Sequence, residues 1–223
     1  MRRRPVVTID GPSGSGKSTV SKLLAESAGM VRLDTGAMYR ACALAARRTG
    51  IPWSDAARMG DLARTISFSF GGPDGRTGVF LENEDISAAI RTPEISMGAS
   101  EVSVHESVRE ALVDKQRELG KEGGVVLEGR DTGTVVFPDA EMKFFLDAAA
   151  AVRALRRYLE RSSLDKQSYE QVLKEVLRRD VQDSTRKCSP LKMASDARYI
   201  DSTTMTADEV VEAMIRELSG YAL

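Results

Sequence analysis

Histidine and cysteine are both scarce in this chain of 223 residues. His105 is the one histidine, and Cys42 and Cys188 are the two cysteines. A site built from several imidazoles, or a Ser–His triad, therefore has little support, and the two cysteines lack the C-x-x-C spacing of a zinc or redox site. We expect both thiols to be reduced, as in a cytoplasmic protein, and His105 to be a surface or capping residue.

An excess of charge of one sign and long apolar runs are also absent. Lysine and arginine number 32, aspartate and glutamate 33, and the formal net charge is −1. Bulk electrostatics therefore gives no case for a nucleic-acid partner, so an anionic ligand must be attracted by arginines that cluster locally. No apolar stretch approaches the roughly 20 residues of a membrane span. No apolar signal core follows the arginines at 2–4, and we expect a cytoplasmic protein without a membrane partner.

Short apolar runs alternate with helical patterns along the chain. This alternation predicts an α/β fold in which helices cover both faces of a central parallel sheet, giving three layers. Ligands on such sheets bind beyond the carboxyl ends of the strands. A hairpin-like piece, 67–70 with 79–82, interrupts the alternation and indicates an insertion. The expected sheet strands are 6–9, 31–33, 125–127, 142–146 and 199–200, and the expected helices are 17–28, 37–48, 55–66, 94–103, 108–122, 148–161, 169–183 and 207–219.

A glycine-rich loop follows the first expected strand. Residues 11–18 read G-P-S-G-S-G-K-S and fit G-x-x-x-x-G-K-[ST] at every fixed position. Glycines let backbone N–H groups turn inward around phosphate oxygens, and the next helix presents its positive end to the same anion. Lys17 is expected at the β- and γ-phosphates, and the Ser18 hydroxyl on Mg²⁺. The loop residues expected to bind ATP are Gly11, Pro12, Ser13, Gly14, Ser15, Gly16, Lys17, Ser18 and Thr19.

Further segments are more specific than this loop. Residues 33–40 read L-D-T-G-A-M-Y-R, residues 90–94 read I-R-T-P-E, residues 128–138 read E-G-R-D-T-G-T-V-V-F-P, and 183–186 read D-S-T-R. At these segments the chain resembles the cytidylate kinase family, over nearly its whole length. The resemblance implies a P-loop kinase that is a monomer. Its core would be about 1–35, 104–150 and 168–223, with an acceptor-binding insertion over about 36–103 and a short lid over about 151–167.

The resemblance also implies roles for individual residues. Lys17, Arg40, Arg130 and Asp131 are expected to be catalytic. Arg153 and Arg157, in the lid, are expected on ATP, with Mg²⁺ as the cofactor. The residues expected to bind CMP are Thr35, Arg40, Ser100, Arg109, Arg130, Asp131, Arg179, Asp183 and Arg186.

The residue types suit this chemistry. Transfer between ATP and a monophosphate brings two polyanions together, so the site needs several cations besides the loop lysine. Arginine is favoured because its planar fork meets phosphate oxygens with two hydrogen bonds. Cytosine shows an amino donor at N4 and acceptors at N3 and O2. Hydroxyl or carboxylate oxygens can accept from N4, and arginine can donate to the other two positions.

The expected reaction is direct in-line transfer of the ATP γ-phosphoryl group to CMP or dCMP, with no covalent enzyme intermediate. One alternative is a kinase for another acceptor, such as UMP, dTMP or shikimate, because a P-loop alone does not separate these. A second alternative is a nucleotide-dependent switch, although the chain has no N-K-x-D segment for reading guanine. Whether nucleotide turnover requires a second substrate distinguishes the switch from the kinases.

Overall fold

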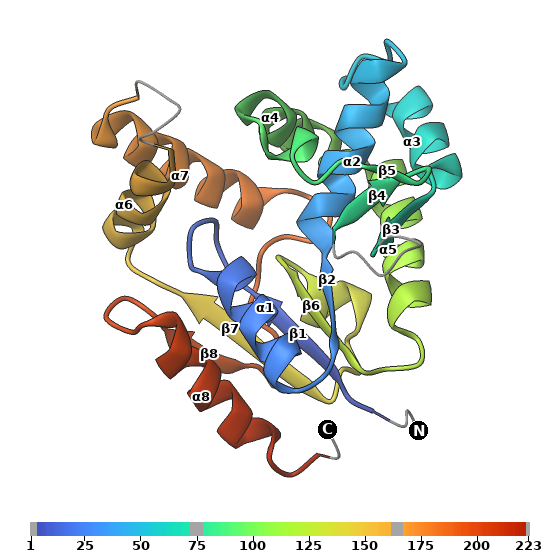
Figure 1. The fold of residues 1–223 in the computed structure, drawn as a ribbon. Coiled ribbons are helices and arrows are strands. Elements are labelled where there is room, and N and C mark those ends of the chain that lie inside the picture. The colour runs from blue at the N-terminus through green and yellow to red at the C-terminus, as the bar shows by residue number, and fades with distance from the viewer. Residues whose placement is uncertain (1–3, 72–77, 162–166, 222–223) are drawn as a thin grey trace. The chain divides into compact units, whose positions relative to one another are not determined.

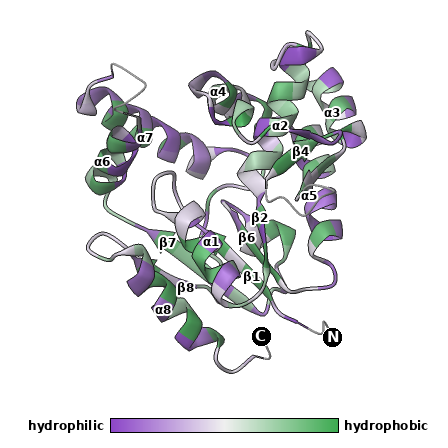
Figure 2. Cartoon of the chain, viewed as in Figure 1, coloured by the Kyte–Doolittle hydropathy of each residue, from purple (hydrophilic) through white to green (hydrophobic). Residues whose placement is uncertain are grey.

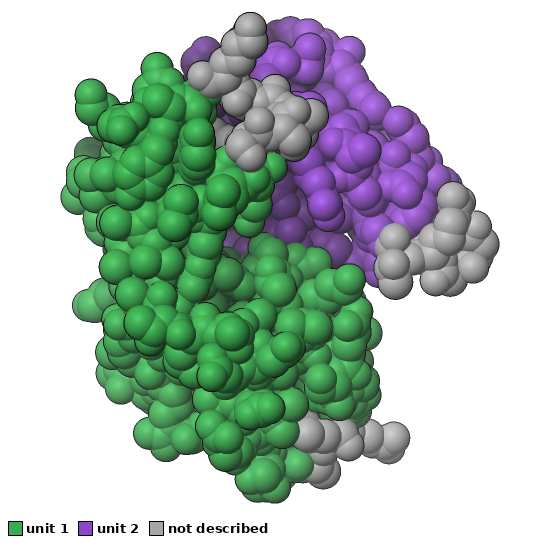
Figure 3. Space-filling view, turned by 60° about the vertical axis from the view of Figure 1, so that its left-hand side comes forward, with its two compact units in different colours: residues 1–32, 120–223 green, residues 33–119 purple. Residues whose placement is uncertain are grey.

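A computed structural model of the chain describes residues 4–71, 78–161 and 167–221. The chain forms two compact units, which Figure 3 colours separately. Unit 1 combines Met1–Arg32 with Gly120–Leu223, and unit 2 is Leu33–Leu119. The P-loop therefore belongs to unit 1, whereas the expected insertion at 36–103 lies wholly within unit 2.

Unit 1 is built on a parallel sheet, although the last two residues of strand β2 (Val31–Asp34) lie past the Arg32 boundary of the unit. Among the described residues the strand order is β2-β6-β1-β7-β8 (Figure 1), and the strands are β1 Val6–Asp10, β2 Val31–Asp34, β6 Val125–Gly129, β7 Met142–Asp147 and β8 Arg198–Asp201. β1 is parallel to β6 and β7, and β7 is parallel to β8. All five predicted strands are confirmed, each one or two residues longer than expected. The carboxyl ends of β1, β6 and β7 meet at one edge because Asp10 pairs with both Gly129 and Phe145.

One face of this sheet is covered by two helices, α1 (Lys17–Ser27) and α8 (Ala207–Leu218), which lie side by side in Figure 1. Leu24 from α1, Met214 from α8 and Phe144 from β7 belong to the same buried cluster. Figure 2 shows the central strands largely hydrophobic and α8 hydrophobic and hydrophilic by turns, as an amphipathic helix requires. Burial of this apolar surface is the main favourable term that holds the layer on the sheet.

The rest of unit 1 consists of a helix pair and a turn. Helices α6 (Ala150–Arg161) and α7 (Tyr169–Thr185) pack on each other through Ala154, Val172 and Val176. Ser168 caps α7, since its hydroxyl accepts from the N–H of Gln171 while the Gln171 side chain accepts from the N–H of Ser168. Between β6 and β7 the backbone forms one wide helical turn over Thr132–Val136. We call residues 130–136 the Arg130 turn; no sequence pattern predicted its shape.

Unit 2 is mainly helical. Its helices are α2 Thr35–Arg48, α3 Ala56–Thr65, α4 Pro93–Val102 and α5 Glu106–Gly120, whose last residue already belongs to unit 1, and its small antiparallel sheet comprises β3 Phe68–Phe70, β4 Val79–Leu81 and β5 Glu84–Asp85. The predicted hairpin is present, and β5 is an additional strand. α2 begins two residues before its expected start because the Asp34 carboxylate accepts from the N–H of Ala37 at 2.9 Å. Unit 2 also includes most of α5, which the sequence had placed in the core.

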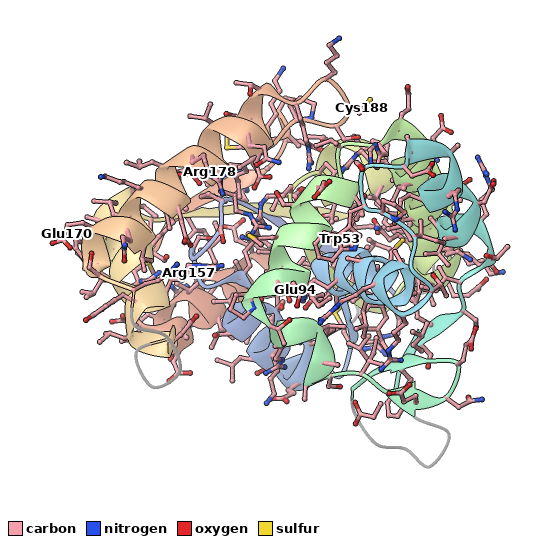
Figure 4. The ribbon with its side chains drawn as sticks, turned by 90° about the horizontal axis from the view of Figure 1, so that it is seen from above. Trp53, Glu94, Arg157, Glu170, Arg178 and Cys188 are labelled. Atoms are coloured by element: carbon pink, nitrogen blue, oxygen red, sulfur yellow. The ribbon has the colours of Figure 1, made fainter. Side chains whose placement is uncertain are left out.

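Trp53 ties several segments of unit 2 together and lies beside α4 in Figure 4. Its indole Nε1 donates to the carbonyl of Ala43 at 2.9 Å, and its own carbonyl lies 2.7 Å from Nε2 of His105. A side chain at Gly98 would meet the indole ring at 2.5 Å, so the ring packs directly on the backbone of α4. His105 is half-buried in this packing. Across the described ranges no helix is both long and apolar enough to cross a membrane.

Candidate nucleotide-binding site

The glycine loop leaves the carboxyl end of β1 and ends at the first residue of α1. Gly11 has a φ of 152°, and a Cβ there would lie 2.0 Å from the carbonyl oxygen of Leu146. Gly14 has a φ of 81°, and its Cβ would lie 2.9 Å from the carbonyl oxygen of Arg153. The loop therefore packs so closely on β7 and α6 that these positions accept only glycine.

Lys17 lies in the loop as a buried cation. Its Nζ donates to the carbonyl of Pro12 at 2.5 Å and to the hydroxyl of Ser15 at 3.3 Å. Burial, together with the nearby charge of Arg130, holds the pKa of Lys17 well below its usual value, although Glu128 and other carboxylates act in the opposite direction. The ends of β1 and β6 thus bring two cations together at one edge of the sheet.

Ser18, the expected Mg²⁺ ligand, contacts a carboxylate. Its hydroxyl donates to Oε2 of Glu128 at 2.8 Å, and Arg32 pairs with Oε1 of the same carboxylate. Arg32 Nε also donates to Oγ of Ser21 at 2.9 Å. A hydroxyl and a carboxylate at this spacing are oxygen ligands of the kind Mg²⁺ prefers, so the residues present suit the ion.

The two lid arginines of the sequence prediction, Arg153 and Arg157, lie on α6 beside the loop. Arg153 is 5% exposed and donates from Nη1 to the carbonyl of Ser13 at 3.1 Å and from Nε to the carbonyl of Ala148 at 2.8 Å. Its Nη1 and Nη2 reach the two carboxylate oxygens of Asp180 at 3.0 and 2.6 Å. Arg157 (labelled in Figure 4) donates from Nη1 to the Ser13 hydroxyl at 3.4 Å. Arg153 is thus a buried brace between α7 and the loop.

A second brace was not predicted. Arg156 Nη2 donates to the carbonyl of Ser202 at 2.7 Å, and the Ser202 hydroxyl reaches the carbonyl of Ser15 at 3.1 Å. Ser202 follows β8, and its own N–H donates to the carbonyl of Asp147 at 2.8 Å. Ser202 thereby links β8, the edge strand of the sheet, to the glycine loop by a hydrogen bond.

Arginines and aspartates from the Arg130 turn and from the end of α7 form a charged cluster. Arg130 Nε donates to Oδ2 of Asp183 at 2.8 Å, and Arg179 Nε lies 3.9 Å from the same oxygen. Arg186 Nη2 lies 3.6 Å from Oδ1 of Asp131. Burial alone would raise the pKa of Asp183, but the charges of Arg130, Arg179 and Arg186 outweigh it and lower that pKa. The structure therefore brings together the five residues that the sequence predicted in these two segments: Arg130, Asp131, Arg179, Asp183 and Arg186.

The remaining predicted acceptor residues lie in unit 2. Arg40 donates from Nη2 to Oδ2 of Asp34 at 2.8 Å, and its Nε is buried without a hydrogen-bond partner among the described residues. Arg109 is buried with its guanidinium 5.5 Å from the ring centroid of Tyr39. Thr35 is buried at the start of α2, and Ser100 is half-buried on α4.

A glycine loop between the first strand and first helix of a parallel sheet, ending in Lys-Ser, defines the P-loop nucleotide-binding class of α/β proteins. A solved gluconokinase from Sinorhizobium meliloti 1021 has this fold: its TM-score is 0.50 at 15% identity, with 98% of this chain and 94% of that chain covered. That likeness extends to the fold alone.

The sequence comparisons give the family. The cytidylate kinase family model matches residues 7–219. A cytidylate kinase of Geobacter sp. (strain M21) is 49% identical over 212 residues, which are 95% of this chain and 91% of that protein. Another, from Citrifermentans bemidjiense, is 50% identical over 211 residues, 94% of this chain and 90% of that protein. The chain belongs to the cytidylate kinase family.

Proposed function

We propose that this protein is an ATP-dependent kinase that transfers the γ-phosphoryl group of ATP to CMP or dCMP and releases ADP with CDP or dCDP. Membership of the cytidylate kinase family supports the proposal. The observation that carries it is that Lys17, at the end of the loop that follows β1, and Arg130, directly after β6, lie close enough for the charge of Arg130 to add to burial in lowering the pKa of Lys17. Such paired cations suit a reaction in which two polyanions must approach each other.

On the ATP side, the loop residues 11–19 would surround the phosphates, with Lys17 on the β- and γ-oxygens. Burial lowers the pKa of Lys17, so an anionic phosphate beside Nζ would stabilise its charged form. Arg157 is a further ATP contact in this proposal. Arg153 keeps its predicted place at the ATP site, where it would act through its bond to the Ser13 carbonyl.

On the acceptor side, Arg130 and Arg40 would bind the phosphate of CMP. The buried Nε of Arg40, which has no hydrogen-bond partner among the described residues, is a donor available to a phosphate oxygen. Arg179 and Asp183 would contact the ribose. The other acceptor residues are Asp131 near the nucleotide and Thr35, Ser100, Arg109 and Arg186 at the cytosine.

Kinases of this kind use ATP together with a divalent cation, and we propose Mg²⁺. Ser18 would ligate it, and Glu128, whose Oε2 accepts from the Ser18 hydroxyl, would support it. When bound, the ion supplies charge neutralisation at the β- and γ-phosphates. Removal of the ion with EDTA should stop ADP release, and added Mg²⁺ should restore it.

The transfer itself needs no strong general base, because the attacking oxygen of CMP is already anionic at neutral pH. The residues therefore orient and stabilise charge, with Lys17, Arg40, Arg130 and Asp131 closest to the reacting groups. We keep the acceptor lobe over about 36–103 and the lid over about 151–167 as parts of the proposal. Residues 162–166 of that lid lie outside the described residues. We further propose a cytoplasmic monomer without nucleic-acid or membrane partners.

The test is ADP release from ATP and Mg²⁺ with a panel of acceptors: CMP, dCMP, UMP, dTMP, AMP, GMP and shikimate. CMP and dCMP should give the highest kcat/KM, and Arg186→Ala should reduce their advantage over UMP. The matched control is Arg178→Ala, since Arg178 is an exposed arginine on α7 (Figure 4), the helix that ends one residue before Arg186. A different preferred acceptor would overturn the base contacts. ADP release that no acceptor stimulates would favour the nucleotide-dependent switch.

A further inference from the structure

Asp10 is a buried carboxylate that the reaction described above does not use. It is the last residue of β1, directly before the glycine loop, and it is 4% exposed. Its hydrogen bonds go across to the Arg130 turn. The N–H and the hydroxyl of Thr132 both donate to Oδ1 at 2.8 Å, and the N–H of Gly133 donates to Oδ2 at 2.7 Å.

These bonds hold a segment that also has backbone hydrogen bonds of its own. Within the Arg130 turn the carbonyl of Asp131 accepts from the N–H of Val135 at 2.9 Å, and the carbonyl of Thr132 accepts from the N–H of Phe137 at 2.8 Å. Because the turn is closed by its own hydrogen bonds, a shift at Thr132 carries Asp131 and Arg130 with it. The hydrogen bonds from Thr132 and Gly133 to Asp10 therefore fix the backbone from which the side chains of Arg130 and Asp131 extend.

The Arg130 turn also packs tightly against β1 at Gly133. A Cβ on Gly133 would lie 2.8 Å from Oγ1 of Thr8 and 3.4 Å from Oδ2 of Asp10, and Thr132 is fully buried. Both oxygens of Asp10 accept hydrogen bonds, which selects the ionised carboxylate. Burial raises the pKa of Asp10, while the hydrogen bonds from Gly133 and Thr132 oppose that rise.

We propose that Asp10 is a positioning residue for the acceptor phosphate: its carboxylate seats the Arg130 turn on the strand that also starts the glycine loop, and so fixes Arg130 and Asp131 relative to Lys17. The inference rests on the proposed function, in which Arg130 binds the phosphate of CMP. Asp10 touches neither nucleotide in this proposal; it acts through the backbone of Thr132 and Gly133.

The test compares the affinities of CMP and cytidine, measured calorimetrically without ATP, in the full chain and in Asp10→Asn. An asparagine offers one oxygen and one amino group, so one of the two backbone N–H groups would face a donor. We expect CMP affinity to fall about tenfold or more, as the loss of a buried charged hydrogen bond implies. Cytidine, which lacks the phosphate, should bind within about twofold of the unaltered protein.

Two further variants separate positioning from general loss of stability. Val211→Ala removes buried apolar surface from α8, away from the turn, and should leave the ratio of CMP to cytidine affinity unchanged. Gly133→Ala should lower that ratio as Asp10→Asn does. The double variant should lose less CMP affinity than the two single losses added together, because both substitutions disturb the same contact between Asp10 and the turn. Should Asp10→Asn fail to fold, Thr132→Val removes only the hydroxyl bond, and it should show a smaller selective loss of CMP affinity.

The outcomes are distinguishable. If the unaltered protein neither binds nor phosphorylates CMP, the proposed function fails, and the role of Asp10 fails with it. Suppose that the unaltered protein phosphorylates CMP, but that Asp10→Asn lowers the affinities for CMP and cytidine equally or changes neither affinity. The inference is then overturned while the proposed function stands. A rise in the KM for CMP that exceeds the rise in the KM for ATP supports it. Thr132→Val with an unchanged affinity ratio contradicts it.

Discussion

Replacing Arg153 by methionine should destabilise the fold, not merely weaken ATP binding. The side chain is 6% exposed, and its partner carboxylate on Asp180 is 24% exposed. The guanidinium donates four hydrogen bonds: two to the Asp180 carboxylate, one to the Ser13 carbonyl and one to the Ala148 carbonyl. Methionine fills much of the volume but leaves the Asp180 carboxylate and the carbonyls of Ser13 and Ala148 without this donor.

The expected loss is about 3–5 kcal/mol in the free energy of unfolding, the usual cost of removing one partner from a buried ion pair. Against a total of about 5–15 kcal/mol for a domain, this is a large fraction. The double variant Arg153→Met with Asp180→Leu should recover most of it, because no buried charge is left unpaired. Arg48→Met is the control: Arg48 also forms a two-bond pair, with Glu84, but at an exposed site.

Urea unfolding followed by circular dichroism measures these differences, and steady-state kinetics gives the KM for ATP in the same variants. We expect both the midpoint and the KM to change in Arg153→Met, since the Ser13 carbonyl belongs to the ATP loop. An unchanged free energy of unfolding together with a raised KM for ATP would refute the structural reasoning. Arg153 would then be a lid residue that binds ATP directly, as the sequence alone predicted.

Three further predictions concern single side chains. Cys42 is fully buried and burial raises its pKa to about 12, so Ellman's reagent should modify Cys188 in the native protein and Cys42 only after denaturation. The pKa of Asp183 in the folded protein lies below its ordinary value of 3.8. The stability that its charged form contributes is therefore complete above pH 3.8 and is lost as the pH falls through the lower folded pKa. Asp183→Asn should therefore be less stable at neutral pH and lose less stability on acidification, as unfolding curves between pH 7 and 3 would reveal. Gly11→Ala should abolish ATP binding measured by calorimetry, since its Cβ would lie 2.0 Å from the Leu146 carbonyl oxygen.

Local patterns predicted the elements of the fold well. The run at 6–9 is β-branched and apolar because β1 is buried on both faces, and every residue of β1 is indeed buried. α2 begins two residues before the apolar helical pattern at 37–48 because Asp34 caps it, and hydrophobic periodicity does not register a cap. The wide turn at Thr132–Val136 follows no helical or strand period, so periodicity had no signal for it.

The division of the chain was harder to predict. α5 carries an ordinary helical pattern, and such a pattern does not say which unit a helix joins. Val108 and Leu112 pack with Met38 and Met59, so α5 belongs with the core of unit 2. Domain membership depends on which apolar faces meet in three dimensions, and only the folded chain decides that.

The sequence by itself determined the glycine loop, the order of strands and helices, and the arginine-rich segments that mark the cytidylate kinase family. Each of these is a local pattern, written in the spacing of neighbouring residues. Only the tertiary structure decided that Arg153 is a buried brace and that Asp10 holds the Arg130 turn. The bond from Thr132 to Asp10 joins residues 122 positions apart, and it exists because parallel register places Asp10 beside Gly129. Contacts of this kind depend on which strands become neighbours, and local spacing does not encode that choice.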